Sequence, residues 1–217
     1  MKLEDHVFAG IEAFDRGEQE HALLHACIAV DGTSQKQSGL SQSKKSCYIQ
    51  FIRNYYWILE PMTGSGINFN DTYWDNVPLT DQDGKPIQKL DMASFVYYLF
   101  RCAQVHGKEI ETKYKLLPRS QNSQLYYHIA DDRLHIPETL IWGLLSICVF
   151  CKSNNDIKTN TDHFLTLGNN KFCISDWWGL EDSVRPIVEK HNPIRVTLQG
   201  LAFSKNTLDV IDQADDR

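Results

Sequence analysis

The sequence lacks the features that mark secreted, membrane-spanning and nucleic-acid-coating proteins. Its first residues, Met1 to His6, do not show the basic stretch followed by an apolar stretch that a secretion signal has. No apolar run approaches the roughly 20 residues that cross a bilayer. The formal net charge is −6, which gives the whole chain no attraction to a polyanion. We therefore expect a cytoplasmic protein that does not enter a membrane.

Cysteine is too sparse for a disulfide scaffold. Six cysteines are spread over 217 residues, and several lie in apolar stretches, so free and mostly buried thiols are expected. Hydrophobic residues make up 42% and charged residues 23%, which is ordinary for a globular protein. This length predicts a single domain, residues 1–217, built around one core.

Apolar residues recur at helical spacing in the first third of the chain. The pattern over residues 6–30 is interrupted around Arg16-Gly17, which predicts one long helix or two short ones. Residues 31–46 are rich in Gly, Ser, Gln and Lys and are predicted to form an irregular connection. A second helix is predicted to begin near Lys45 and to end at Pro61.

Two further helices are predicted in the middle of the chain. One runs from about residue 89 to 106, with Gly107 placed as its C-terminal stop. The next opens at Pro137 and continues to Phe150, and it is apolar nearly all round, which predicts the most buried helix. Residues 62–88, between the second and third helices, carry many turn-forming residues and are predicted to be irregular, anchored by Tyr73 and Trp74.

Strand patterns appear in two places. Residues 113–117 and 125–129 flank a polar turn and predict one small antiparallel hairpin. Residues 164–167 and 171–174 flank Gly168-Asn169-Asn170 and predict a second hairpin, before a short helix over 181–191. The predicted fold is mostly α, an antiparallel bundle of about four helices over residues 6–152, with small hairpins. Residues 153–217 form a C-terminal appendage.

The best candidate for chemistry lies at the end of the third predicted helix. Arg101 can hold a phosphate through two donors, and His106 can move protons near neutral pH. Five positions at roughly 100° per residue place the two side chains about 140° apart on an ideal helix. They converge only if the helix end distorts or a second chain completes the site.

This Arg-x4-His sequence, at the end of an apolar helix and followed by Gly107, resembles the Arg-x4-6-His motif of the HEPN superfamily. The motif's place on the third helix agrees, as does Ala26 to Gly32 at the end of the opening helix, and the resemblance covers about residues 6–152. It implies a homodimeric endoribonuclease, often of toxin-antitoxin or antiviral defence systems, that needs neither metal nor other cofactor. By the same resemblance, Arg101 holds the scissile phosphate and His106 acts as general base or acid.

One residue departs from that pattern. Active HEPN nucleases commonly have a polar residue after the Arg, and this chain has Cys102. Two alternatives therefore stay open. One is a catalytically silent HEPN-like module that binds nucleotide, RNA or a protein partner such as an antitoxin. The other is a structural protein in which His106 stabilises a helix end and Arg101 bridges to a carboxylate.

Other constellations are discounted as functional sites. His21 and His25 have metal-binding spacing on a helix, but Ala22 replaces the Glu of a zinc protease. Arg53-Asn54 has the polar follower but no His four to six positions later inside the helix. The remaining candidates have simpler interpretations as core thiols, a turn and packing anchors: Cys148 and Cys151, Gly64-Ser65-Gly66, and Trp142, Trp177 and Trp178.

Overall fold

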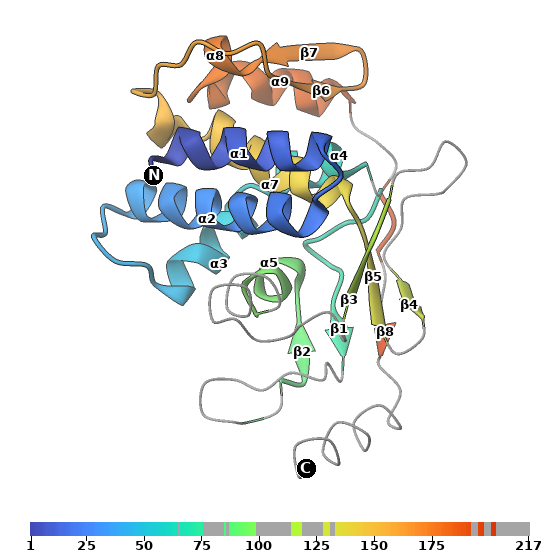
Figure 1. The fold of residues 1–217 in the computed structure, drawn as a ribbon. Coiled ribbons are helices and arrows are strands. Elements are labelled where there is room, and N and C mark those ends of the chain that lie inside the picture. Colours follow the sequence, from blue (N-terminus) through green and yellow to red (C-terminus); the bar gives the residue numbers. More distant parts are fainter. Residues whose placement is uncertain are drawn as a thin grey trace.

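The computed structural model describes residues 1–64, 66–75, 85, 87–98, 114–118, 128–130, 133–191, 195–197 and 201–202. Over these residues the chain is mostly helical, with a few small sheets (Figure 1), which confirms the mostly α part of the predicted fold class. One hydrophobic cluster connects the elements and extends from Val7 to Val188. Among the described helices, none combines the length and the apolar character that crossing a membrane requires.

The N-terminal part forms two helices, α1 (Leu3–Asp15) and α2 (Gln19–Ser38), which lie side by side. The break falls at Gly17, whose φ of 77° favours glycine. The prediction of an irregular connection from residue 31 was wrong for residues 31–38. Thr33 and Ser34 are buried in α2 and donate hydrogen bonds to the carbonyls of Ala29 and Asp31, so these polar side chains are satisfied within the helix.

The predicted second helix is two helices, α3 (Lys45–Asn54) and α4 (Tyr56–Thr63). They are separated at Tyr55, and Pro61 lies inside α4 instead of ending the helix as predicted. Proline removes only one donor, and α4 ends two residues later, where Gly64 takes a left-handed conformation and donates to the Pro61 carbonyl.

Helix α7 (Thr139–Phe150) is the most buried of the described helices that are longer than one turn, as predicted, since every residue in it except Trp142 is buried. It packs along α4, and Gly143 lies against Leu59 of that helix. A Cβ at this position would lie 2.7 Å from Leu59 Cδ1 and 3.2 Å from the Leu59 carbonyl oxygen. Pro137, expected to open this helix, is instead the last residue of the strand before it.

The first predicted hairpin was wrong in its pairing. Strand β3 (Tyr114–Leu117) runs parallel to β5 (Arg133–Pro137), and β4 (His128–Ala130) pairs antiparallel with β5, so β5 lies between the two strands expected to pair. Only two residues separate β4 from β5, whereas ten separate β3 from β4. The shorter connection closes a hairpin at a lower cost in chain entropy.

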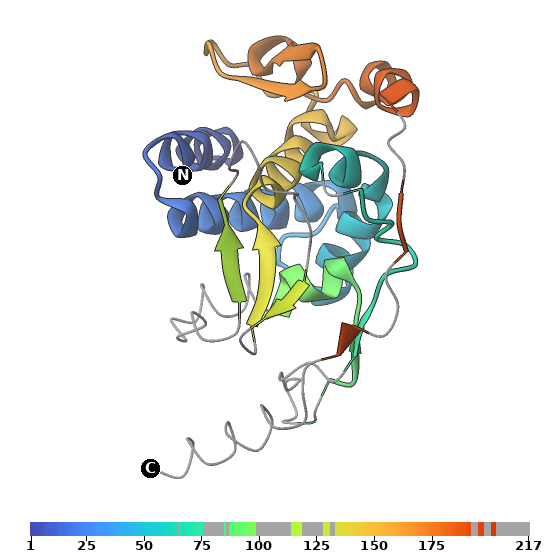
Figure 2. The same ribbon diagram turned by 90° about the vertical axis from the view of Figure 1, so that its right-hand side faces the viewer.

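The second hairpin and the last helix are confirmed. Strands β6 (Phe164–Leu167) and β7 (Asn170–Cys173) pair antiparallel, followed by α8 (Ile174–Trp177) and α9 (Glu181–His191). Figure 1 shows these elements above α1 and α7, and the turned view in Figure 2 shows the same layer with α9 at its right end. A short 3-10 helix, η2 (Lys152–Asn154), leaves the end of α7.

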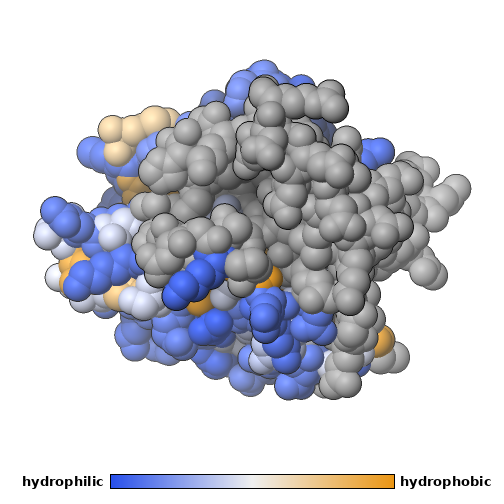
Figure 3. Space-filling model, turned by 90° about the horizontal axis from the view of Figure 1, so that it is seen from below, coloured by the Kyte–Doolittle hydropathy of each residue, from blue (hydrophilic) through white to orange (hydrophobic). Residues whose placement is uncertain are grey.

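A third small sheet and the start of a helix lie below α3 in Figure 1. Strand β1 (Trp74–Asp75) pairs with β2 (Lys89–Leu90) and with β8 (Leu201–Ala202), although residues 62–88 had been predicted to be irregular. Trp74 is fully buried, as its predicted role of anchor requires. Because residues 89 and 90 form β2, helix α5 (Met92–Phe95) begins at residue 92 and not at 89. From below (Figure 3), the described surface is mostly hydrophilic, with hydrophobic residues appearing singly.

Candidate functional site

The predicted catalytic residues Arg101 and His106, and Cys102 between them, lie outside the described residues. The structure therefore leaves their mutual geometry open. It does describe the first turn of the helix that leads toward them in the sequence, α5, and it describes a polar pocket on another part of the molecule.

The first turn of α5 is fixed by the buried carboxylate of Asp91. Its Oδ1 accepts a hydrogen bond from the Ser94 backbone N at 3.1 Å, which caps the helix. Its Oδ2 lies 2.6 Å from Arg53 Nε on α3, and Tyr56 donates its hydroxyl hydrogen to the same oxygen at 3.2 Å. Burial would raise the pKa of Asp91, but hydrogen bonds from Arg53 and Ser94 outweigh it and lower the pKa below its usual value. Arg53, discounted as part of a nuclease motif, thus ties α3 to α5.

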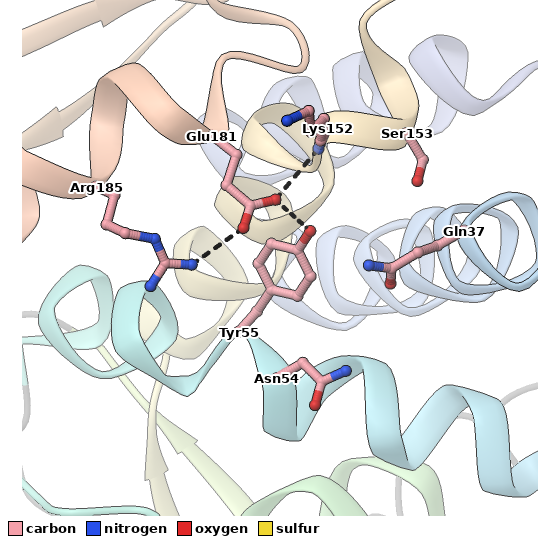
Figure 4. Close-up of a pocket in the computed structure, with 7 residues that line it drawn as sticks. All are labelled: Gln37, Asn54, Tyr55, Lys152, Ser153, Glu181 and Arg185. Atoms are coloured by element: carbon pink, nitrogen blue, oxygen red, sulfur yellow. Dashed lines mark hydrogen bonds and ion pairs between the residues drawn. The ribbon is translucent and has the colours of Figure 1, made fainter.

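The polar pocket has a volume of about 580 Å³ and lies where α2, η2, α9 and the junction of α3 and α4 meet (Figure 4). Its charged residues are Lys152, Glu181 and Arg185. Its uncharged residues are Gln37, Asn54, Tyr55 and Ser153. The volume falls in the range of roughly 300–1,000 Å³ that small-molecule sites occupy.

The charged groups of the pocket are already paired. Glu181 accepts hydrogen bonds from the Tyr55 hydroxyl at 2.6 Å and from the Arg185 guanidinium at 3.1 Å. Lys152 Nζ lies 2.9 Å from a carboxylate oxygen of Asp182. Burial, together with hydrogen bonding to Cys151 and Glu181, raises the pKa of Tyr55 well above its usual value, so its hydroxyl remains a donor.

The uncharged side chains of the pocket, in contrast to the charged ones, keep hydrogen-bonding groups that are not paired. The Gln37 and Ser153 side chains, and Asn54 Nδ2, have no hydrogen-bond partner among the residues that the structure describes. Asn54 uses its Oδ1 to accept from Gln50 at 2.8 Å, which orients its amide. Figure 4 shows these three side chains around the same open space. These three side chains can supply hydrogen-bond donors and acceptors to a ligand, beside the remaining N–H donors of Lys152 and Arg185.

The histidines on the first two helices do not form the metal pair that was weighed and discounted. His21 is exposed and lies 3.5 Å from Glu18, while His25 faces α1, where its Nδ1 lies 3.1 Å from His6 Nδ1. Burial lowers the pKa of both His6 and His25, so both favour the neutral form. Among the described residues, no three His, Cys, Asp or Glu side chains are grouped to hold a metal ion.

The described cysteines are free thiols. Cys148 and Cys151 are fully buried at the end of α7, and burial raises the pKa of Cys148 well above its usual value, which agrees with their interpretation as core residues. Trp178 is buried, and Trp142 and Trp177 pack partly buried against the core, as expected of packing anchors.

Comparison with known proteins gives one clear assignment. A family model described as Rv1289 matches residues 2–205. The chain belongs to the Rv1289 family. Relatives include the uncharacterized proteins Rv1289 of Mycobacterium tuberculosis and Mb1320 of Mycobacterium bovis, each 28% identical over 207 residues, which are 94% of this chain and 94% of theirs. No solved structure matches the chain. The names of these relatives describe no activity.

In this member of the Rv1289 family, sequence reasoning missed the polar pocket. Its residues come from four elements and from Tyr55 between α3 and α4, and the first and the last, Gln37 and Arg185, are far apart in the chain. No local spacing joins them, and single exposed Gln, Asn and Ser residues are common on any protein surface. Of these residues, only Glu181 has a position that the local sequence predicts. It is an acidic residue at the start of an amphipathic segment, which is typical of a helix N-terminus.

Proposed function

We propose that this chain is a HEPN-like, metal-independent endoribonuclease of the cytoplasm that acts as a homodimer. In this proposal Arg101 binds the scissile phosphate, and His106 transfers protons. The finer features of the resemblance belong to the proposal as well: an antiparallel four-helix bundle, a role in toxin-antitoxin or antiviral defence, and an antitoxin or other protein partner.

The proposed reaction needs only groups of the protein and the RNA. The RNA 2′-oxygen attacks phosphorus while one imidazole accepts its proton, and the bond from phosphorus to the 5′-oxygen breaks as a second imidazole protonates that oxygen. The products are a 2′,3′-cyclic phosphate and a 5′-hydroxyl. Arg101 stabilises the negative charge that develops on the phosphoryl oxygens. Two subunits would supply the two imidazoles.

The observation that carries the proposal is the sequence Arg101-x4-His106-Gly107, placed downstream of a helix with an anchored first turn. Met92 to Phe95 are buried, and Asp91 caps them while held by Arg53. A helix start fixed in this way supports a motif that must be positioned within fractions of an ångström. The mostly helical fold is compatible with the resemblance.

A second candidate is a silent binding module, and the polar pocket between α2, η2 and α9 favours it. The pocket has paired charges and unpaired amide and hydroxyl groups, which suits recognition of a ligand better than chemistry on one. Cys102, in the position where active HEPN nucleases commonly have a polar residue, agrees with this candidate.

The deciding experiment is cleavage of a mixed RNA pool in EDTA by the full-length chain. We expect the unaltered protein to leave cyclic-phosphate ends, and Arg101→Ala and His106→Ala each to reduce the rate by about a hundredfold or more. Arg16→Ala and His21→Ala are matched controls, because both side chains are more than half exposed and each forms its ion pair with Glu18.

The outcomes separate the two candidates. Cleavage that both site variants abolish and both controls retain supports the nuclease. Absence of cleavage, or cleavage that ignores Arg101 and His106, overturns it and leaves the binding module.

A further inference from the structure

Strand β6 has an unpaired edge, because its sheet contains only β6 and β7 among the described residues. The Ile174 backbone N donates to the His163 carbonyl at 3.0 Å, which marks one hydrogen-bonded position of the hairpin. In an antiparallel pair these positions alternate, so the backbone N–H and C=O of Phe164 and Thr166 point away from β7. They have no hydrogen-bond partner in the part of the chain that the structure describes. This edge of β6 can therefore accept a further strand.

A hollow of about 350 Å³, here called the β6 groove, runs along this edge. Five consecutive residues, 162–166, line it. Successive strand side chains point to opposite faces of a sheet, so a hollow that touches all five residues follows the backbone edge between them. Ile11 and Asp15 of α1 line the groove as well, and His163 contacts α1 at Phe8, with 5.7 Å between the ring centres. The groove thus lies between a strand edge and a helix, which is a geometry that suits an added strand.

The groove also exposes apolar surface. Phe164 is 44% exposed, and Trp142 of α7, which lines the groove together with Met62 of α4, is only partly buried. A strand added to β6 presents alternate side chains to the same face. An apolar side chain of such a strand would cover these rings and remove their apolar area from water, which stabilises the complex.

The charge of the groove favours a basic occupant. Asp15 and Asp162 are exposed carboxylates without an ion-pair partner among the described residues. Glu12 lies beside them, with its carboxylate 3.9 Å from His163. Lys171 of β7 places its ammonium 3.7 Å from the centre of the Phe164 ring, so three carboxylates face one ammonium. The groove therefore keeps a net negative charge.

Two other occupants match this charge less well. Residues 209–217 of the chain itself contain four Asp and one Arg, so this segment would bring like charges into an acidic groove. A second copy that paired edge to edge through β6 would bring the carboxylates of the two copies together, with the same unfavourable result.

We infer that the β6 groove binds an extended, basic segment of a protein partner, which adds a third strand to the hairpin. The backbone of Phe164 and Thr166 supplies the hydrogen bonds. An apolar side chain of the segment covers Trp142, while its lysines or arginines pair with Asp15 and Asp162. The inference goes beyond the proposed nuclease function and does not involve the residues proposed to cleave RNA.

The test begins with a phage-displayed library of random nine-residue peptides, selected on the immobilised full-length chain. We expect the selected peptides to be rich in Lys and Arg, alternating with apolar residues. The most enriched peptide is then made in two N-methylated forms, with the methyl groups on odd or on even positions. Only alternate N–H groups of an added strand face β6. One form should therefore bind at least tenfold more weakly, and the other should bind nearly as the unmodified peptide does, measured by fluorescence anisotropy.

A proline at the edge tests the same hydrogen bonds from the protein side. Thr166→Pro removes an N–H that points away from β7, and an edge strand tolerates proline at such a position. We expect this variant to bind the peptide at least tenfold more weakly. Cys173→Pro is the matched control, because it lies on the opposite edge of the same hairpin and its φ of −66° already suits proline.

Charge variants test the choice of a basic partner. Asp15→Asn and Asp162→Asn should each weaken binding of the peptide by about twofold to fivefold, the effect expected of exposed ion pairs, and added salt should weaken binding to the unaltered chain. Asp176→Asn makes the same change of charge at an exposed position that does not line the groove, so it should leave the affinity unchanged.

Several results would overturn the inference: no peptide enriched above a selection on the Thr166→Pro chain, enrichment of acidic peptides, or two N-methylated forms that bind equally well. A dimer that Thr166→Pro dissociates, seen by sedimentation, would assign the edge of β6 to a second copy instead. Thermal unfolding checks that each variant is folded. The Arg101→Ala/His106→Ala variant should bind the peptide as the unaltered protein does, which separates this inference from the proposed nuclease.

Discussion

The helices around α7 and the segments attached to α3 and α4 are held in place by different forces. Around α7, the contacts are mostly apolar, its buried serine and cysteine donate to carbonyls within the same helix, and Thr139 donates to the Thr63 carbonyl of α4. Along α3 and α4, buried carboxylates make the attachments. Asp91 connects α5 to Arg53 and Tyr56, and Glu60 accepts from the Phe69 backbone N at 2.8 Å and lies 3.0 Å from Arg195.

This difference has a consequence for the proposed nuclease site. Apolar packing tolerates changes of pH, whereas a buried carboxylate depends on its partners and on its ionisation. Burial raises the pKa of Glu60, while the donors around Asp91 lower the pKa of that group. The helix start that precedes Arg101 in the sequence therefore belongs to the part of the molecule that is anchored by charge.

The largest effect on stability is expected from a substitution in the apolar region around α7. Leu144→Ala removes a fully buried side chain from α7, and we expect the free energy of unfolding to fall by about 2–5 kcal/mol, measured by urea denaturation. Leu180→Ala is the control, since this leucine is 41% exposed, and it should change stability by no more than about 0.5 kcal/mol. Equal effects of the two substitutions would contradict the view that α7 is the centre of the core.

A smaller effect is expected where charge makes the attachment. Asp91→Ala removes the cap of α5 and the partner of Arg53, and we expect a loss of about 2 kcal/mol in the same measurement. Asp91→Asn keeps an oxygen for the Ser94 N–H but loses the negative charge, so it should cost less. If Asp91→Asn is as damaging as Asp91→Ala, the ion pair with Arg53 matters more than the cap.

The smallest expected effect is a pH dependence of folding stability, caused by the histidines His6 on α1 and His25 on α2. The pKa values of His6 and His25 are lowered in the folded state, so the unfolded chain binds more protons, and stability is lost as pH falls through about 6.5 toward the folded values. Stability measured from pH 7.5 to 5.5 should fall, and His25→Asn should reduce that slope. His21 is the smaller of the two causes that lower the pKa of His25, so His21→Asn should reduce the slope less than His25→Asn does.

Local patterns predicted the elements whose stabilising contacts are close in the sequence. The apolar helix ending at Phe150, the hairpin around Gly168 and the helix from Glu181 were predicted from spacing and turn residues, and the structure confirms them. Of the two alternatives left open around Gly17, the structure has the two short helices. In each of these elements the residues that decide the conformation lie within a few positions of one another.

The predictions that failed concern contacts between residues that are far apart in the sequence. The parallel pairing of β3 with β5 depends on which strands meet in space, and neither strand shows this in its own sequence. The pocket is a similar case, because Gln37 and Asn54 line the same hollow only after α2, α3 and α9 have packed. Residues 31–38 were missed for another reason, since the buried hydroxyls of Thr33 and Ser34 are satisfied by the carbonyls of their own helix.

The burial of the thiols sets how the folded protein meets oxidants and alkylating reagents. Cys27, Cys148 and Cys151 are buried, whereas Cys47 and Cys173 are partly exposed. Because the reactive form is the thiolate, and burial disfavours it at Cys148, a reagent can modify that side chain only after α7 has separated from its neighbours. The rate at which Cys148 is modified therefore reports how often α7 separates from the helices around it.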